Sequence, residues 1–463
     1  MKNMTLENIA AACNGVYYGP EEKKNFCITS VTMDSRTIEE GGLFAAIAGE
    51  RVDGHRFIPQ VIENGAGAVL SEKLPADAGS EGFPTIVVPS TEEALREIAE
   101  YYLKQLNIPV IGIVGSVGKT STKEMTAAVL SQKYRVLKTE GNFNNELGVP
   151  LTVFRLREED EIAVLEMGIS NFGEMSVLAK ITRPDTVIMT NIGTAHLEFL
   201  GTRDGILKAK TEVFEFMKEN GHIILNGDDD KLSLVEQPKG IAPVRFGIGE
   251  KGFSHENTIW ADNVVKHGMH GVSCTIHTPQ GSFSCMIPSP GRHMVYNALA
   301  GAAAGLAYGL TLEEIESGIE SYESIKGRFH IVETDLYTIV DDCYNASPAS
   351  MEASLGILKD ADGRRVAILG DMGELGSDEV LLHAGVGRFA AECGIDALYC
   401  AGPLSKNIAD TAASLNDKME IRHYQDLGAL LKALPLLLRK GDTILIKASH
   451  FMQFDKIVAE LRD

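Results

Sequence analysis

Val110-Ile-Gly-Ile-Val-Gly-Ser-Val-Gly-Lys-Thr-Ser-Thr122 decides the fold of this 463-residue chain. A β-branched apolar segment ends in a glycine-rich turn, and the residues from Lys119 onward open a predicted helix. Glycines let backbone N–H groups curl around a phosphate, and the helix N-terminus adds favourable partial charge. The stretch therefore predicts a phosphate loop between a strand and a helix.

The residue types of this loop suit a nucleoside triphosphate. The Lys119 ammonium can reach the β- and γ-phosphates, and the Thr120 hydroxyl can ligate Mg²⁺. The usual pattern has a glycine six residues before the lysine, where this chain has Ile113, so neighbouring glycines supply the flexibility at shifted positions. The pattern predicts ATP with Mg²⁺ as cofactor, bound by Gly115, Ser116, Gly118, Lys119, Thr120 and Ser121.

Length and composition predict a globular protein of about three domains, at ~150 residues each. The net charge of −21 argues against a nucleic-acid partner, because the backbone phosphates would be repelled. The chain has no apolar run of ~20 residues that would predict a membrane span, and its first residues lack the apolar core of a signal peptide. Seven scattered cysteines without a CxxC pair predict free thiols. We therefore expect a cytoplasmic protein.

Three α/β segments follow one another along the chain. Residues 1–107 predict a small N-terminal α/β domain, which ends at the break Leu106-Asn-Ile-Pro109. Residues 108–325 alternate strand and helix, which predicts a central P-loop ATPase-like domain with a mostly parallel sheet. Within it, residues 255–287 have the short alternating segments and Gly/Pro turns of antiparallel hairpins. Residues 326–463 predict a C-terminal Rossmann-like domain of five or six strands, without the glycine pattern of a dinucleotide site.

Periodic spacing of apolar residues gives the individual elements. The expected strands cover residues 28–33, 43–46, 68–70, 85–88, 109–114, 162–166, 186–190, 222–225, 337–341, 365–369, 397–401 and 443–447. The expected helices cover residues 5–12, 57–64, 91–105, 121–131, 174–181, 205–218, 292–308, 347–358, 379–393, 426–438 and 451–461.

Polar side chains follow the predicted strands of the central domain. Glu166 ends one strand, at the sheet edge where α/β folds bind ligands, so it could hold Mg²⁺ beside the phosphates. His196 follows another strand, and a metal ligand and a structural histidine are equally compatible with the sequence there. Asn142, Asn144 and Asn145 form a dense set of amide donors and acceptors, although asparagine is also typical of ordinary turns.

The C-terminal domain has similar polar clusters at its predicted strand ends. Asp341 and Asp342 end one strand, and Lys447-Ala-Ser-His450 closes the last one. Arg328, just after the second domain boundary, could reach across a cleft toward phosphate. A cleft that faces the phosphate loop would explain these clusters together.

These segments together resemble the Mur ligase family, ATP-dependent amide-forming enzymes of bacterial cell-wall synthesis. The likeness runs across nearly the whole chain, and the shifted glycine of the phosphate loop is also typical of this family. The resemblance implies an enzyme that adds D-alanyl-D-alanine to UDP-N-acetylmuramoyl-tripeptide (UDP-MurNAc-tripeptide) through an acyl phosphate. The matching motifs are Gly115-Ser-Val-Gly-Lys-Thr-Ser121, Gly141-Asn-Phe-Asn-Asn-Glu-Leu-Gly-Val-Pro150, Glu166-Met-Gly168, Asn191-Ile-Gly-Thr-Ala-His196 and Asp342-Cys-Tyr-Asn-Ala-Ser-Pro348.

The resemblance also implies roles for single residues in catalysis and metal binding. Lys119 would bind the β- and γ-phosphates, and Thr120, Glu166 and His196 would surround two Mg²⁺ ions. Lys210 matches a family lysine that carries CO₂ as a carbamate and so becomes an anionic metal ligand. The implied catalytic residues are Lys119, Glu166, His196 and Lys210.

Further residues are implied to bind the nucleotide and the substrates. Asn297 would contact the adenine end of ATP, and Arg328 and Asp342 would close over the nucleotide. The segments Asp34-Ser-Arg36 and Gly49-Glu-Arg-Val-Asp-Gly-His55 would hold the UDP-sugar end, through Ser35, Arg36, Asp53 and His55. The other implied substrate contacts are Asn142, Asn144, Asn145, Tyr344, Asn345, Lys447 and Ser449.

Two departures from the family pattern concern the incoming dipeptide. Ser347 and His450 stand where the family often has Asn and Arg, so no residue is assigned to the dipeptide carboxylate. A sister Mur ligase or a folylpolyglutamate synthase-like ligase, each adding a single amino acid, is an alternative, and so is a P-loop ATPase or kinase. The asparagine-rich and Asp342 motifs favour the dipeptide-adding enzyme. We also expect the protein to be a monomer.

Overall fold

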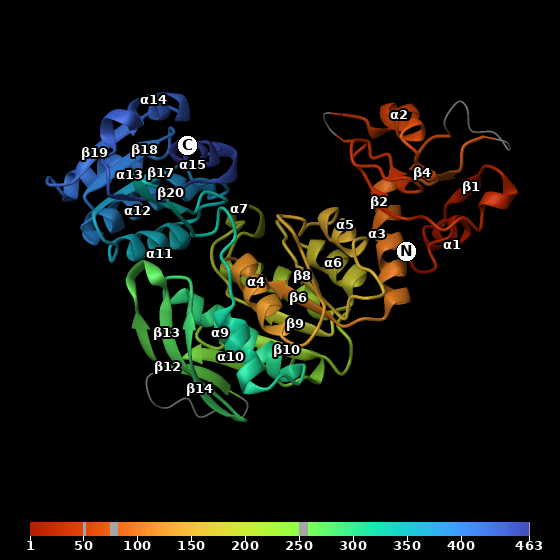
Figure 1. The fold of residues 1–463 in the computed structure, drawn as a ribbon, viewed down its shortest axis with the longest axis horizontal. Coiled ribbons are helices and arrows are strands. Elements are labelled where there is room, and N and C mark those ends of the chain that lie inside the picture. Colours follow the sequence, from red (N-terminus) through yellow and green to blue (C-terminus); the bar gives the residue numbers. More distant parts are fainter. Residues whose placement is uncertain (50–51, 75–81, 250–257, 463) are drawn as a thin grey trace.

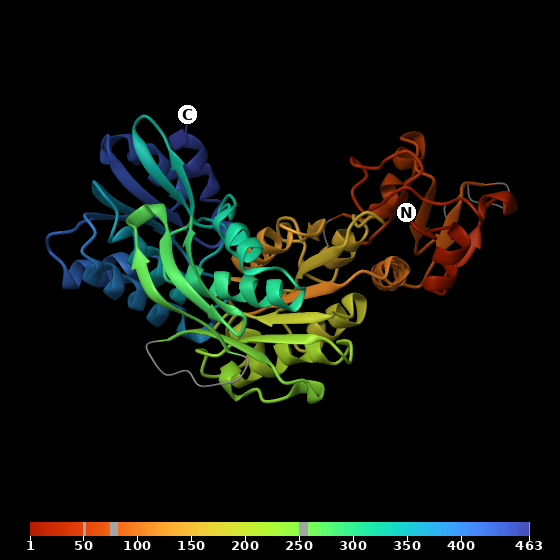
Figure 2. The same cartoon turned by 60° about the horizontal axis from the view of Figure 1, so that its bottom comes forward.

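The computed structural model describes residues 1–49, 52–74, 82–249 and 258–462. The strands of these ranges form three sheets, of five, nine and six strands. Figure 1 shows three units that follow one another along the chain, and in Figures 1 and 2 the N- and C-terminal units lie on either side of the central one. The predicted α/β class with three domains is confirmed.

The N-terminal unit consists of a small sheet and three α-helices within the described ranges. The strands are β1 (Val16–Tyr18), β2 (Val31–Thr32), β3 (Leu43–Ala45), β4 (Ala68–Ser71) and β5 (Thr85–Val87), and the helices are α1 (Leu6–Ala12), α2 (Ile58–Glu63) and α3 (Thr91–Leu106). Strands β2 to β5 are parallel, and β1 runs antiparallel to β5. Helix α3 is capped by the Ser90 side chain and ends at Asn107, which has a left-handed φ of 54°.

Helix α3 packs on the central unit as well as on its own sheet. Glu100 accepts a hydrogen bond from Arg183 at 2.9 Å, and the buried Tyr102 hydroxyl donates to the Leu156 carbonyl at 2.6 Å. The apolar side of α3 belongs to one continuous core with residues of both units. The N-terminal and central units therefore share a core across residue 107.

The central sheet has a parallel interior and an antiparallel edge. Its strands are β6 (Val110–Val114), β7 (Val136–Lys138), β8 (Ile162–Glu166), β9 (Thr186–Met189), β10 (His222–Asn226), β11 (Val244–Ile248), β12 (Thr258–Lys266), β13 (Val272–Thr278) and β14 (Gly281–Ile287). Strands β6 to β12 pair in parallel, and β13 is antiparallel to both of its neighbours. The predicted hairpins are therefore confirmed at β12–β14, although residues 255–257 lie outside the described residues.

Helices cover both faces of the central sheet, which buries β6 completely. Residues of β6 alternate between two cores, with Val110 and Val114 in one and Ile111 and Ile113 in the other. One face is covered by α4 (Lys119–Leu130), α9 (His293–Ala307) and α10 (Leu312–Glu320). The other face is covered by α5 (Gly148–Val153), α6 (Glu174–Thr182), α7 (Leu197–Leu200) and α8 (Arg203–Thr211).

The C-terminal unit is a six-stranded sheet in the order β15-β16-β20-β17-β18-β19, parallel except for β15. Its strands are β15 (His330–Glu333), β16 (Tyr337–Asp341), β17 (Arg364–Gly370), β18 (Ala397–Ala401), β19 (Glu420–Tyr424) and β20 (Asp442–Lys447). Its helices are α11 (Pro348–Leu358), α12 (Glu379–Cys393), α13 (Lys406–Leu415), α14 (Leu427–Leu437) and α15 (Asp455–Arg462). In the described ranges of the whole chain, no helix is long and apolar enough to cross a membrane.

Several expected elements differ from the observed ones. The expected helix 205–218 is too long, because α8 ends at Thr211 and a 3₁₀ turn follows. The expected strand 28–33 is only β2, and the expected helix 451–461 begins at Asp455, because Gln453 has a left-handed φ of 55°. Elements without a prediction are β1, β7, β11, β15, β19, α5, α7, α10 and α13.

Two helical glycines are expected to respond in opposite ways to alanine. A Cβ atom at Gly318 in α10 would collide with the backbone of Val129 in α4, so Gly318→Ala should lower the free energy of unfolding of the central unit by about 1–3 kcal/mol. A Cβ atom at Gly385 in α12 meets nothing within 4 Å, so Gly385→Ala should stabilise the C-terminal unit by about 0.5–1 kcal/mol. Urea unfolding followed by circular dichroism measures both changes. A gain in stability for Gly318→Ala would contradict the packing of α10 on α4.

Candidate active site

The phosphate loop joins β6 to α4 at the carboxyl edge of the central sheet. Gly118 is the N-cap residue of α4 and has a φ of 81°, a left-handed conformation that favours glycine. Asn191, just after β9, holds the loop from one side. Its Oδ1 accepts the Val117 N–H at 3.0 Å and its Nδ2 donates to the Val117 carbonyl at 2.9 Å. Lys119 Nζ donates to the Gly115 carbonyl at 3.0 Å, so contacts within the protein already shape the loop.

Glu166 ends β8 beside this loop, and only part of its carboxylate is satisfied. Its backbone N–H donates to Thr139 Oγ1 at 3.0 Å, and Asn144 Nδ2 donates to Glu166 Oε1 at 2.8 Å. Glu166 Oε2 is buried and has no hydrogen-bond partner among the described residues. A buried carboxylate oxygen without a partner is costly unless a cation binds it. Glu166 therefore has the properties of a Mg²⁺ ligand.

Two lysines of the central unit, Lys119 and Lys210, have lowered pKa values. Burial lowers the pKa of Lys119, and Arg328 adds to this shift while the Glu166 carboxylate opposes it. Lys210 in α8 is only 1% exposed, and its side chain makes no hydrogen bond or ion pair to the described residues. Burial, together with repulsion from Lys119, lowers the pKa of Lys210 well below its usual value. The Lys210 site therefore favours the neutral amine.

His196 follows β9 and faces the C-terminal unit. Its Nδ1 lies 2.8 Å from Glu374 Oε2 and 3.4 Å from Ser170 Oγ. Its other ring nitrogen, Nε2, makes no hydrogen bond to the residues that the structure describes, and His196 lines the same cavity as Glu166. One ring nitrogen is thus engaged and the other is available to a ligand.

Asp342, just after β16, is the carboxylate of its pair that lines the cavity. Its Oδ2 accepts hydrogen bonds from Lys447 Nζ and Ser354 Oγ, both at 2.6 Å, and its Oδ1 accepts the Phe329 N–H at 3.1 Å. Asp341 accepts a backbone N–H from the turn before β15 instead. The Asp342–Lys447 pair is buried and its carboxylate is fully hydrogen-bonded.

Arg328 and Tyr344 bring the C-terminal unit close to the phosphate loop. The Arg328 guanidinium lies over the Tyr344 ring, 4.1 Å from its centroid. Tyr344 lines the same cavity as Asn142 and Glu166 of the central unit. Its ring centroid is 5.5 Å from that of His450, which stands where the family often has arginine.

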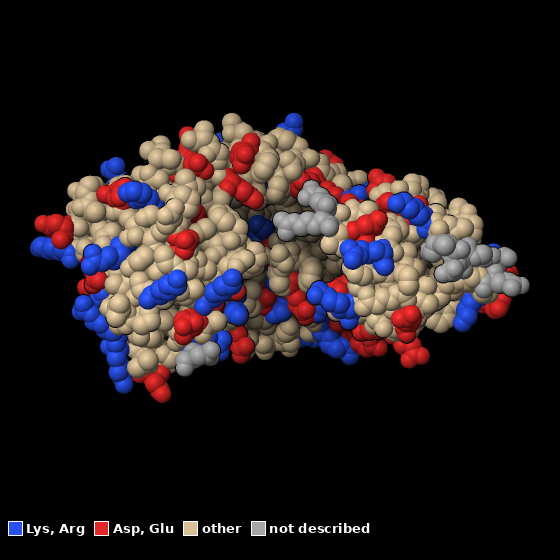
Figure 3. All heavy atoms as spheres, turned by 90° about the horizontal axis from the view of Figure 1, so that it is seen from above, with Lys and Arg blue, Asp and Glu red and all other residues tan. Residues whose placement is uncertain are grey.

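A cavity of about 840 Å³ lies between the central and C-terminal units. Its size is typical of cofactor and substrate sites. Figure 3 shows a hollow near the middle of the molecule, with lysine or arginine atoms at its depth. The predicted site residues that line the cavity are Ser116, Gly118, Lys119, Thr120, Ser121, Asn142, Glu166, His196, Asn297, Arg328, Asp342, Tyr344, Asn345, Lys447 and Ser449.

The other predicted residues of the central unit do not line the cavity. They are Gly115, Asn144, Asn145 and Lys210. Asn144 reaches Glu166, as described, but the Asn145 side chain accepts the Gly148 N–H at 2.8 Å. Asn145 therefore matches the alternative of an ordinary turn residue.

The predicted UDP-sugar residues lie in the N-terminal unit and do not line this cavity. They are Ser35, Arg36, Asp53 and His55. Arg36 forms an ion pair with Asp34 at 2.6 Å, and Asp53 Oδ1 is 2.6 Å from His55 Nδ1. Residues 50–51 of the same segment lie outside the described residues.

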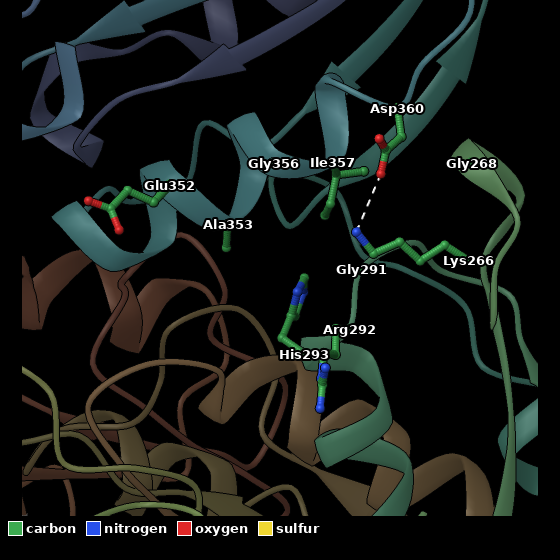
Figure 4. A pocket seen from close by; sticks show the side chains of 10 residues that line it. All are labelled: Lys266, Gly268, Gly291, Arg292, His293, Glu352, Ala353, Gly356, Ile357 and Asp360. Atoms are coloured by element: carbon green, nitrogen blue, oxygen red, sulfur yellow. Dashed lines mark hydrogen bonds and ion pairs between the residues drawn. The ribbon is translucent and has the colours of Figure 1, made fainter. Parts of the chain in front are cut away.

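A second cavity of about 210 Å³ lies between α11, the end of β12 and the start of α9 (Figure 4). Lys266 of the central unit and Asp360 of the C-terminal unit form an ion pair there, at 3.4 Å. His293 lines both cavities. The C-terminal unit is thus joined to the central unit by ion pairs at two separate places, Lys266–Asp360 and His196–Glu374.

Three residues that shape the site received no role from the sequence. Asn191 follows a strand directly, and the rule that singles out Glu166 could have found it. Thr139 and Glu374 act through partners that are distant in the sequence, so no local pattern signals them.

These features define a multidomain P-loop protein with its site between two α/β units. Residues 27–111 match the Mur ligase family, catalytic domain; residues 113–305 match the Mur ligase middle domain; and residues 327–450 match the Mur ligase, glutamate ligase domain. The chain belongs to the Mur ligase family.

Relatives with known names cover the chain from end to end. The chain is 37% identical to UDP-N-acetylmuramoyl-tripeptide–D-alanyl-D-alanine ligase of Bacillus subtilis, over 100% of this chain and 99% of that protein. MurF from Acinetobacter baumannii superposes with a TM-score of 0.86 at 33% identity, over 99% of this chain and 98% of that one. MurF ligase from Thermotoga maritima, solved in complex with ADP, has a TM-score of 0.80 at 29% identity, over 94% and 97% of the two chains.

The buried Asp342–Lys447 pair predicts a non-additive effect on stability. Lys447→Met should lower the free energy of unfolding of the C-terminal unit by about 3 kcal/mol, because it leaves the Asp342 carboxylate without its counter-charge. Adding Asp342→Asn should recover part of that loss, since the remaining side chain is neutral. Urea unfolding of both single variants and the double variant gives the coupling energy. A coupling near zero would contradict the observed pair.

Proposed function

We propose that this chain is an ATP-dependent ligase that joins D-alanyl-D-alanine to UDP-MurNAc-tripeptide by an amide bond. The products are UDP-MurNAc-pentapeptide, ADP and phosphate. The observation that carries the proposal is the half-satisfied Glu166 carboxylate beside Lys119, in a cavity formed by two units. Full-length similarity to the B. subtilis enzyme named for these substrates supports their choice.

The residues around the phosphate loop fit ATP and Mg²⁺. The loop residues 115–118, of which 116–118 line the cavity, would hold the phosphates together with Lys119, Thr120 and Ser121. When bound, Mg²⁺ polarises phosphoryl oxygens as a Lewis acid. Two such ions would be held by Glu166 Oε2, Thr120 and His196, with Lys210 as a further ligand after carbamylation. Asn297, whose Oδ1 accepts a hydrogen bond from Thr122 at 2.9 Å, would face the adenine.

The proposed reaction begins with the tripeptide carboxylate, which attacks the γ-phosphorus of ATP and displaces ADP. Lys119 and Arg328 offset the charge on the transferred phosphoryl group. The dipeptide amine then attacks the acyl carbon, loses a proton, and phosphate leaves. Because an acyl phosphate reacts with water, the site has to be covered, and the Arg328–Tyr344 stack and Asp342 of the C-terminal unit supply part of that cover.

The remaining assignments follow the family resemblance. We propose that the UDP-sugar end is held by Ser35, Arg36, Asp53 and His55, and that the peptide parts contact Asn142, Asn144, Tyr344, Asn345, Lys447 and Ser449. Asn144 and Lys447 would act largely by positioning Glu166 and Asp342, with which they are already hydrogen-bonded. We place the domain boundaries near residues 107 and 325.

We also propose that the protein acts as a monomer in the cytoplasm. All seven cysteines are free thiols, as expected in a reducing compartment, and this includes Cys274 and Cys285, which lie opposite each other on β13 and β14.

Phosphate release tests the proposed reaction. We expect release from ATP with Mg²⁺ to require both UDP-MurNAc-tripeptide and D-alanyl-D-alanine, with the pentapeptide product identified by mass. Lys119→Ala should lower kcat by at least about 10²-fold, because it removes a cation from the transferred phosphoryl group. Release without either substrate would indicate an ATPase, transfer to a hydroxyl a kinase, and a product with a single amino acid a sister ligase.

Carbamylation of Lys210 is a separate prediction. The neutral amine attacks CO₂ and loses a proton, which gives a carbamate anion that removes the repulsion with Lys119. With ¹³C-bicarbonate we expect a protein carbamate signal in the ¹³C NMR spectrum, absent in Lys210→Arg. Lys208→Arg is the matched control, because Lys208 is exposed on the same helix and should leave the signal intact. A wild-type protein without the signal would exclude the modification.

A further inference from the structure

We infer that Glu374 is a positioning residue for the metal site, which acts from the C-terminal unit on His196 of the central unit. Its carboxylate holds the imidazole through Nδ1 and leaves Nε2 as the nitrogen that binds a divalent cation. The inference rests on the proposed function, because that proposal makes His196 a metal ligand.

The contact between Glu374 and His196 selects the tautomer of the imidazole that is protonated at Nδ1. Glu374 Oε2 is 2.8 Å from His196 Nδ1, and an ionised carboxylate can only accept a hydrogen bond. Nδ1 therefore carries the proton, and Nε2 keeps the lone pair that a metal needs. Ser170 Oγ, 3.4 Å from Nδ1, lies on the same side of the ring.

The backbone on both sides of this contact is strained. His196 has a φ of 61° and Glu374 a φ of 59°, in the left-handed region that residues with a Cβ atom seldom adopt. Non-glycine residues in such conformations cluster at functional sites. The Glu374 side chain is 56% exposed, and an exposed ion pair contributes little to stability. The strained conformations of His196 and Glu374 are therefore poorly explained by a contribution of this ion pair to the stability of the fold.

Glu374 makes the orientation of a metal ligand depend on the C-terminal unit. Thr120, Glu166 and His196 all belong to the central unit, whereas Glu374 follows β17 of the C-terminal sheet. Next to it, Gly376 approaches Glu198 of α7, which immediately follows His196. Cation affinity should therefore rise when the C-terminal unit occupies the observed position.

Binding of Mn²⁺ to the full chain with saturating ADP, followed by the EPR signal of free Mn²⁺, tests the inference without turnover. Glu374→Gln keeps the length of the side chain and removes its charge, and should weaken Mn²⁺ binding by about 10- to 100-fold. Asp360→Asn is the matched control, because it removes the other ion pair between the units among the described residues, in a different cavity from His196, and should leave the affinity unchanged. Thermal unfolding by circular dichroism verifies that each variant is folded.

A double variant separates positioning from the alternatives. If Glu374 acts through His196, Glu374→Gln should add no further loss of affinity to His196→Ala. Additive losses, or an equal loss in Asp360→Asn, would overturn the inference in favour of a direct ligand or of domain closure alone. A loss in His196→Ala without one in Glu374→Gln would overturn only the positioning role. An unchanged affinity in His196→Ala would also remove the proposed metal site.

Discussion

The buried carboxylate of Glu166, one oxygen of which has no hydrogen-bond partner among the described residues, is the constraint on which the arrangement of the central unit depends. A buried carboxylate is unfavourable unless neighbouring groups stabilise it. Here Asn144 satisfies one oxygen and Thr139 fixes the backbone. Thr139 is itself held by the fully buried Lys123 of α4, which donates to its carbonyl at 2.5 Å. The helix that begins at the phosphate loop thus also positions the carboxylate beside it, and one oxygen remains for a cation.

The charge of the whole protein and the charge of its site have opposite signs. A net charge of −21 would repel a nucleotide in general, but the cavity collects Lys119, Arg328 and Lys447, and Lys210 lies close by. Lys447 is neutralised by Asp342, while Lys119 and Arg328 have no carboxylate of their own within ion-pair distance among the described residues. The two cations without a partner lie at the phosphate loop, and this arrangement favours an anionic ligand there.

The sequence was sufficient to predict a site residue where that residue directly follows a single predicted strand. The α/β class, four of the six C-terminal strands and the positions of Glu166 and Asp342 at strand ends follow from periodicity and the strand-end rule. Which of Asp341 and Asp342 faces the cavity depends on the register of β16 against β20, where Asp341 lies opposite Ile446, and no local pattern contains that information. Edge strand β19 was missed because Glu420-Ile-Arg-His-Tyr424 has only one aliphatic residue. The His196–Glu374 contact depends on the packing of two units and is equally invisible in the sequence.

Helix α3 joins the N-terminal and central units into one rigid part of the molecule, and the C-terminal unit is the second part. Its apolar side lies in a core that continues from the N-terminal sheet into the central unit, so these two units cannot separate without exposing that core. The C-terminal sheet has its own cores, one on each face. A hinge therefore belongs in the connection between α10 and β15, residues 321–329, and not at residue 107. During synthesis, the chain up to α10 can complete one folding unit before the remainder leaves the ribosome.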